Sequence, residues 1–143
     1  MKKKYYVDIG NDVLGLFVNT DEEVEIVPTG IMISSMSISD KNEEYKYIED
    51  NYQVSFLFDD YIPEISFYTV PFVEIFAFNE DGFFVCNNDK IYYINNGECW
   101  IVASHLNEFK DNIRLWKDNL SLSKDIIIYS SKEDAMKELE FIR

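Results

Sequence analysis

The sequence has few of the residues from which most active sites are built. Its 143 residues include one histidine, two cysteines, five glycines and three prolines. One imidazole and two separated thiols cannot form a zinc cluster, and the chain contains neither GxxxxGK[ST] nor GxGxxG to hold a nucleotide phosphate. The calcium-binding loop motif is absent as well. The sequence therefore predicts no cofactor and no metal, and it gives no positive sign of an enzyme.

The nucleophilic side chains lack a suitable base. His105 follows Ser104 at the predicted start of a helix, where the helix dipole disfavours an imidazolium. Ser104 itself is explained as the cap of that helix. Cys86 and Cys99 fall in strand-like segments, so we expect two buried thiols rather than a disulfide or a nucleophile. Catalysis by two carboxylates, as in a glycosidase, stays open because 27 acidic residues offer many pairs.

Long apolar segments are missing too. No run approaches the ~20 apolar residues of a membrane helix. The basic start, Met1–Lys4, is followed by a segment with Asp8 and Asp12 instead of the apolar core of a secretion signal. We therefore expect a soluble cytoplasmic protein that does not contact a membrane.

Basic residues are scarce and unevenly placed. The chain has 13 Lys and Arg against 27 Asp and Glu, a net charge of −14. Residues 5–103 hold 19 acidic residues and three lysines, whereas residues 104–143 hold eight acidic and seven basic residues. Such a field repels nucleic acid and attracts basic partners. The alternative is that the acidity only keeps the protein soluble, and the sequence leaves both interpretations open.

What the sequence does contain is aromatic and apolar residues in short bursts. Aromatics make up 16% of the chain and favour strands. The bursts predict strands at 5–9, 13–18, 24–27, 31–38, 54–58 and 65–70, with a turn at Asp21-Glu22, and a further strand is predicted at 125–129. We expect an α+β fold, a curved and mainly antiparallel sheet with helices packed on it, two of them near the C-terminus. Residues 1–143 are expected to form one domain.

The clearest prediction is a four-stranded antiparallel meander over residues 73–103. Short turns are predicted at 79–82, 87–89 and 95–97, and strands joined by such turns must be neighbours. Asn96-Gly97 is the strongest of these signals, because both central residues of a type I′ turn need positive φ.

Three helices are predicted from caps and apolar spacing. Asp40 is a candidate cap for a short helix over 43–49, and Ser104 for a second helix. Ser130 and Glu133 suggest a capping box for a third. The buried stripe of the second helix is predicted to be Leu106, Phe109, Ile113 and Trp116, and that of the third Ala135, Met136, Leu139 and Ile142.

Acidic residues stand beside tyrosines or turns in several predicted loops. Tyrosine is enriched at protein interfaces, and carboxylates give specificity for a basic partner. The alternative for each cluster is a solvated loop with a half-buried tyrosine. No catalytic residue is predicted, and the candidate partner-binding residues are Glu43, Glu44, Tyr45, Asp59, Asp60, Tyr61, Glu80 and Asp81.

About a third of the chain carries a family resemblance. The matching segments are Pro71–Phe78, Asp81-Gly82, Phe83–Cys86, Lys90–Ile94, Asn96-Gly97, Trp100–Ser104 and Glu108-Phe109. This succession of strands, hairpin and closing helix resembles the SUKH superfamily, which includes cell-wall synthesis regulators and bacterial immunity proteins. The opening helix of that superfamily has no counterpart here, since the first 38 residues predict strands.

The resemblance implies an immunity protein, an antitoxin that occupies the cleft of a cognate and often basic toxin. It implies no catalytic residues. Three alternatives are an acidic mimic of nucleic acid that inhibits a DNA-binding protein, an uncharacterised regulator, and, less favoured, a carboxylate-pair hydrolase. The expected partner is a basic toxin domain, and the protein itself is expected to be a monomer or weak dimer.

Overall fold

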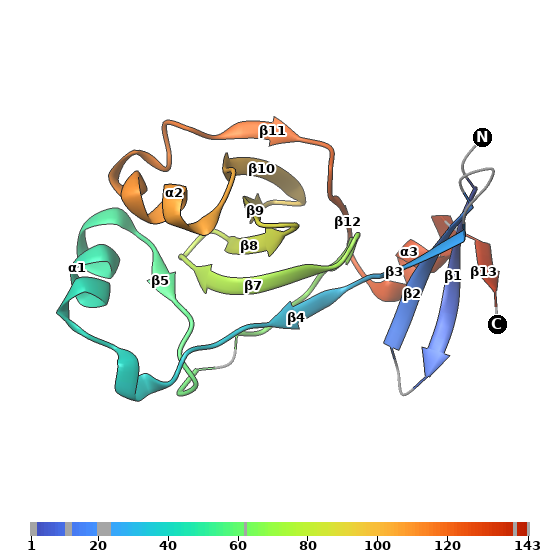
Figure 1. The fold of residues 1–143 in the computed structure, drawn as a ribbon, viewed down its shortest axis with the longest axis horizontal. Coiled ribbons are helices and arrows are strands. Elements are labelled where there is room, and N and C mark those ends of the chain that lie inside the picture. Colours follow the sequence, from blue (N-terminus) through green and yellow to red (C-terminus); the bar gives the residue numbers. More distant parts are fainter. Residues whose placement is uncertain (1–2, 11–12, 20–23, 62, 139, 143) are drawn as a thin grey trace. The chain divides into compact units, whose positions relative to one another are not determined.

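The structure is a computed structural model that describes residues 3–10, 13–19, 24–61, 63–138 and 140–142 (Figure 1). The chain divides into two compact units. Unit 1 comprises residues 1–31, 66–73 and 126–143, and unit 2 comprises residues 32–65 and 74–125. The described residues form mostly antiparallel strands and three α-helices, which confirms the α+β class. The expectation of a single domain stays a prediction.

Unit 1 consists of two small sheets and a helix. Its elements are β1 (Lys3–Gly10), β2 (Val13–Asn19), β3 (Val24–Pro28), β6 (Tyr68–Val70), β12 (Ile127–Tyr129), α3 (Lys132–Glu138) and β13 (Glu140–Ile142). The first sheet has the order β13-β1-β2-β3, with β13 parallel to β1 and the other pairs antiparallel. The second sheet pairs β6 with β12.

Unit 2 is built on a seven-stranded sheet with helices beside it. Its elements are β4 (Ile31–Ile33), the 3-10 helix η1 (Ile38–Asp40), α1 (Glu43–Tyr52), β5 (Ser55–Phe56), β7 (Val73–Phe78), β8 (Phe83–Asn87), β9 (Lys90–Asn95), β10 (Glu98–Ala103), α2 (Leu106–Asp111), the 3-10 helix η2 (Ile113–Leu115) and β11 (Ser121–Ser123). The strand order is β11-β10-β9-β8-β7-β4, and β5 pairs with β7.

The core of unit 2 is aromatic. Phe84 of β8 contacts Tyr93, Phe109 and Trp116, with ring centroids 4.9, 5.4 and 4.8 Å away. The Trp116 indole N–H donates to the Tyr52 carbonyl at 2.7 Å, which joins the end of α1 to the segment after η2. Such rings bury large apolar areas and account for most of the packing energy.

The predicted meander over 73–103 is confirmed as β7 to β10. The Asn79 side chain accepts hydrogen bonds from the Asp81 and Gly82 amides, both at 2.8 Å, and so fixes the β7–β8 turn. A Cβ on Gly82 would lie 2.1 Å from the Ile94 carbonyl oxygen, so only glycine fits there. Asn96 and Gly97 have φ of 51° and 75°, as a type I′ turn requires.

Several predicted strands were too long. Of the segments 31–38, 54–58, 65–70 and 125–129, only Ile31–Ile33, Ser55–Phe56, Tyr68–Val70 and Ile127–Tyr129 are strands. Alternation of apolar residues continues past the point where each segment loses its pairing partner, which explains the excess length. Strands β11 and β13 were not predicted, and the predicted turn at Asp21-Glu22 lies outside the described residues.

The caps of α1 and α2 were each predicted one or two residues too early. Asn42, not Asp40, caps α1, and its side chain accepts from the Glu44 and Tyr45 amides at 3.0 and 3.3 Å. His105, not Ser104, caps α2, because its Nδ1 accepts from the Glu108 amide at 3.0 Å. An unprotonated ring nitrogen can accept as an oxygen does.

The predicted helical stripe after residue 104 spans two elements. Helix α2 ends at Asp111, and Ile113 and Trp116 belong to η2 and its C-terminal cap. Phe109, Ile113 and Trp116 are nevertheless buried, whereas Leu106 is 41% exposed.

The predicted capping box of the third helix is displaced by one residue. Ser131 accepts from the Asp134 amide at 3.1 Å, so the box does not involve Ser130 and Glu133. Ala135 is buried and Met136 half-buried as expected. The helix ends at Glu138, so Ile142 lies in β13, and Leu139 is outside the described residues.

Candidate partner-binding site

An acidic hollow opens where the end of α1 meets the β7–β8 turn. Its volume is about 420 Å³. Four of its seven lining residues carry carboxylates, and the other three are polar and uncharged. The lining residues are Glu49, Asp50, Gln53, Ser55, Asn79, Glu80 and Asp81. We call this site the acidic hollow.

Local backbone geometry brings these residues together. Gln53 adopts the left-handed conformation, φ 58°, that ends α1 and turns the chain into β5. Ser55 of β5 pairs with Phe78 at the end of β7, immediately before the turn. The Asn79 side chain holds that turn and also accepts from the Tyr93 hydroxyl at 2.9 Å. The Glu80 and Asp81 side chains take no part in these bonds, and both residues are exposed.

Most of the charge of the hollow is not neutralised within the protein. The Lys41 amine lies 3.6 Å from the Glu49 carboxylate, and the Lys117 amine donates to the Gln53 side chain. Among the residues that the structure describes, Asp50, Glu80 and Asp81 form no ion pair. Three uncompensated carboxylates around one concavity favour a cationic group from outside.

The structure distributes the predicted residues unequally. Glu80 and Asp81 line the hollow. Tyr61 lies near it, stacked on Phe78 with centroids 5.1 Å apart, and half of its surface is exposed. Asp59 instead accepts from the Ile38 amide at 2.9 Å and stabilises a loop. Asp60 is exposed and does not line the hollow.

The third predicted cluster lies at the other end of α1. Glu43 and Glu44 are exposed in the first turn, where the helix dipole stabilises acidic side chains. The Tyr45 ring packs edge-on against Phe56 and Phe58, with centroids 5.3 and 5.5 Å away. A ten-residue helix is roughly 15 Å long, so this cluster is separate from the hollow.

Glu49 and Asp50 are not among the candidate partner-binding residues named from the sequence, although Asp50 stands in a further acidic–aromatic cluster, Asp50-Asn51-Tyr52. They belong to the last turn of α1, where the dipole disfavours acidic residues and where no basic residue is present. Glu49 is compensated by Lys41, whereas Asp50 has no ion pair among the described residues, so helix stability does not account for its presence at this position. The predicted helix, 43–49, stopped before Asp50, whereas α1 continues to Tyr52. With the correct end of the helix, the sequence alone shows an acidic residue in its last turn.

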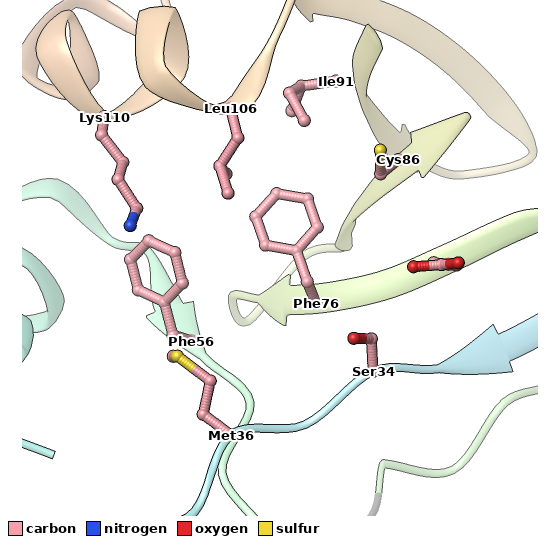
Figure 2. A pocket seen from close by; sticks show the side chains of 9 residues that line it. Ser34, Met36, Phe56, Phe76, Cys86, Ile91, Leu106 and Lys110 are labelled. Atoms are coloured by element: carbon pink, nitrogen blue, oxygen red, sulfur yellow. The ribbon is translucent and has the colours of Figure 1, made fainter. Parts of the chain in front are cut away.

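A second concavity lies between α2 and the strands, and we call it the apolar pocket (Figure 2). Its volume is about 230 Å³. Figure 2 shows Leu106 and Lys110 reaching into it from α2, Phe56 and Phe76 beneath them, and Met36 at the lower side. Apolar side chains dominate its surface. The full lining is Ser34, Met36, Phe56, Glu74, Phe76, Cys86, Ile91, Leu106 and Lys110.

The part of the apolar pocket formed by Glu74 of β7 and Cys86 of β8 is acidic. Burial raises the pKa of the Cys86 thiol, and the nearby carboxylates of Glu74 and Asp89 raise it further, against a bond from the Asp89 backbone that lowers it. Cys86 is half-buried and Cys99 is buried, and both are free thiols, so the expectation of two buried thiols holds fully for Cys99 only. Cys86 is thus a pocket residue with a suppressed thiolate.

The residues considered for catalysis are engaged in capping. The Ser104 hydroxyl hydrogen-bonds the Glu108 carboxylate, and this bond, followed by a smaller effect of His105, lowers the pKa of Glu108. His105 Nδ1 accepts from the Glu108 amide. This arrangement does not place the imidazole as a base for Ser104. Within the described ranges, no three His, Cys, Asp or Glu residues gather as metal ligands.

Comparison with protein-family models, curated proteins and solved structures gives no match for the chain. The SUKH resemblance therefore stays a prediction. In the described part of the chain, no helix has the length and apolar character needed to cross a membrane.

Proposed function

We propose that the protein acts by binding a basic protein partner at the acidic hollow, as a cytoplasmic immunity protein that neutralises a cognate toxin domain. The observation that carries the proposal is the set of unpaired carboxylates of Asp50, Glu80 and Asp81 around one concavity. A partner that inserts a lysine or arginine there replaces repulsion among carboxylates by attraction.

The charge of the whole unit supports the same partner. Unit 2 contains 17 acidic and seven basic residues, and unit 1 contains ten and six. A strongly negative surface accelerates association with a basic protein, and this effect weakens steeply as salt increases. An inhibitor that must capture a toxin before it acts gains directly from such a rate.

The first test is co-purification of the tagged protein from its native host, followed by mass spectrometry. A basic domain should be retained at about 150 mM salt and weakened at about 500 mM, because the screening length falls well below 10 Å. Isolation of that domain then allows its activity to be measured with and without the protein. Retention of no protein at either salt concentration contradicts the proposal.

A matched pair of variants locates the contact. The double variant Glu80→Lys/Asp81→Lys reverses two charges in the hollow, and Glu43→Lys/Glu44→Lys makes the same net change at the start of α1. We expect the hollow variant to lose at least roughly tenfold in association rate at low salt, and the control to lose much less. Equal losses would mean that net charge alone matters and that the hollow is not the contact.

A further inference from the structure

We infer that the apolar pocket accepts one aromatic or aliphatic side chain of the basic partner, with an adjacent lysine or arginine of that partner facing Glu74. This inference rests on the proposed function and adds a second, apolar anchor to the contact at the acidic hollow.

The size of the pocket fits one side chain. Sites for whole small molecules and cofactors usually occupy about 300–1,000 Å³, whereas a cavity of about 150 Å³ already holds a benzene ring. The apolar pocket, at about 230 Å³, lies between these values. Interfaces commonly derive most of their affinity from one or two such side chains inserted into a pocket.

The pocket leaves apolar surface uncovered on a highly charged protein. Leu106 is 41% exposed, and Met36 and Phe76 are half-buried. Figure 2 shows these three side chains directed into the same space. Leu106 and Met36 are flexible and unbranched at Cβ, so the walls can adjust to an inserted ring.

Charge selects the kind of occupant. Lys110 is the one basic residue among those lining the pocket, and Glu74 lines it as well. Asp89 adds a second carboxylate beside Cys86. An anionic amphiphile bound to Lys110 would face these two carboxylates and a chain of net charge −14. A basic segment would instead be attracted by these two carboxylates and by the net negative charge of the chain. We therefore favour a protein segment in which an apolar side chain is next to a cation.

The test uses short peptides and the full chain, with the methyl NMR signals of Met36 and Leu106 as reporters. The probes are acetylated, amidated Lys-Phe-Lys, Lys-Ala-Lys and Glu-Phe-Glu, together with octanoate. We expect Lys-Phe-Lys to bind roughly tenfold more tightly than Lys-Ala-Lys, because a phenyl ring is buried. Glu-Phe-Glu and octanoate should bind more weakly than Lys-Phe-Lys.

Two variants with matched controls tie the binding to the pocket. Ser34→Phe should fill the pocket, and Ser35→Phe makes the same change at the next, exposed position, which does not line it. Leu106→Ala removes one wall, and Leu115→Ala removes a leucine of almost equal exposure, 42% against 41%, outside the pocket. Only the pocket variants should weaken the Lys-Phe-Lys complex, by about tenfold for Ser34→Phe.

Each other result overturns the inference. Equal binding of Lys-Phe-Lys and Lys-Ala-Lys would show that no side chain enters the pocket, and tighter binding of Glu-Phe-Glu or octanoate would identify an anionic ligand on Lys110. Because the peptides replace the partner, these failures are separate from failure of the co-purification. If a basic partner is retained but is insensitive to Ser34→Phe, the proposed function stands and the inference falls.

Discussion

The acidic hollow and the apolar pocket use neighbouring parts of the same strands for opposite purposes. The hollow surrounds a turn and a helix end, and its lining has no apolar side chain. The pocket lies over the middle of the strands, beneath α2, and is mostly apolar. Charge at an exposed turn acts over about 10 Å and is screened by salt. Apolar surface acts only on contact and is not screened by salt. We therefore expect the hollow to govern the rate at which a partner associates and the pocket to govern how long the partner stays bound.

The largest expected effect comes from removing the side chain that holds α2 over the pocket. Phe109 is 1% exposed, and its ring lies 5.9 Å from Phe76. Phe109→Ala should lower the free energy of unfolding by about 3–5 kcal/mol, since it leaves a cavity in the core. Urea unfolding followed by circular dichroism measures this loss. Leu106→Ala, at an exposed position of the same helix, should cost less than about 1 kcal/mol, and equal losses would contradict the packing described.

The reactivity of the Cys86 thiol reports on the apolar pocket, and the buried Cys99 thiol serves as its internal reference. Burial raises the pKa of Cys99 to about 12, and it raises the pKa of Cys86 to a lesser extent. Since the thiolate is the reactive form, iodoacetamide near pH 8 should modify Cys99 at least roughly tenfold more slowly than Cys86, as measured by mass spectrometry of peptides. Ser34→Phe should slow Cys86 and leave Cys99 unchanged, whereas Ser35→Phe should change neither. Faster modification of Cys99 would contradict its burial.

A paired carboxylate elsewhere in unit 2 provides a contrast with the hollow. The Tyr92 hydroxyl donates to the Asp125 carboxylate at 3.1 Å. Burial, followed by this bond and the charge of Asp125, raises the pKa of Tyr92 to about 12 from an ordinary value of 10.0. The folded protein thus holds this proton more tightly than the unfolded chain. The resulting stability is complete below about pH 10 and is lost as the pH rises towards 12.

Tyr92→Phe should cost roughly 1 kcal/mol at neutral pH, because a hydrogen bond is lost. The variant should also lose less stability than the wild type between about pH 10 and 12. Asp125→Asn keeps an acceptor but removes the charge, so the decrease in stability should still begin near pH 10 but should end at a lower pH and be smaller in total. Identical pH profiles of the wild type and Tyr92→Phe, measured by thermal unfolding, would exclude this assignment.

The smallest expected effect is the loss of folding stability caused by repulsion among the carboxylates of the hollow. Glu80→Gln/Asp81→Asn should raise stability by a few tenths of a kcal/mol at low salt, because like charges are removed, and the gain should vanish at high salt. Glu43→Gln/Glu44→Gln should lower stability slightly, because these carboxylates favour the start of α1. A gain in stability for the first variant and a loss for the second would show that the carboxylates of the hollow do not stabilise the fold, whereas those at the start of α1 do. A loss from the hollow variant would mean that its carboxylates stabilise the fold.

Local signals in the sequence were sufficient for the meander. Asn79-Glu80-Asp81-Gly82 and Asn96-Gly97 determine their turns through their own side chains and backbone angles. The parallel pair β1–β13, in contrast, joins Tyr5 to Glu140. No pattern within a short window signals a pairing of that separation, so β13 was missed and its residues were assigned to a helix.

The candidate site was predictable only in part, for a related reason. Glu80 and Asp81 were identified because they occupy a recognisable turn. The hollow exists only because α1 ends beside that turn, a contact set by the pairing of Ser55 with Phe78. The apolar pocket depends in addition on Leu106 and Lys110 of α2 lying over residues of distant strands such as Phe76. Both sites are therefore products of tertiary structure, and single segments do not show them.

The pairing of β1 with β13 has a consequence during synthesis on the ribosome. Residues 3–10 emerge more than a hundred residues before 140–142. At about 5–20 residues per second, β1 waits for seconds with that edge unpaired. Unit 2, residues 32–65 and 74–125, is complete by comparison once residue 125 has been made, before the residues of β13. Unit 2, which contains both candidate sites, is thus expected to be formed while unit 1 still depends on its final strand, and an exposed edge in a nascent chain is where pairing with other chains begins.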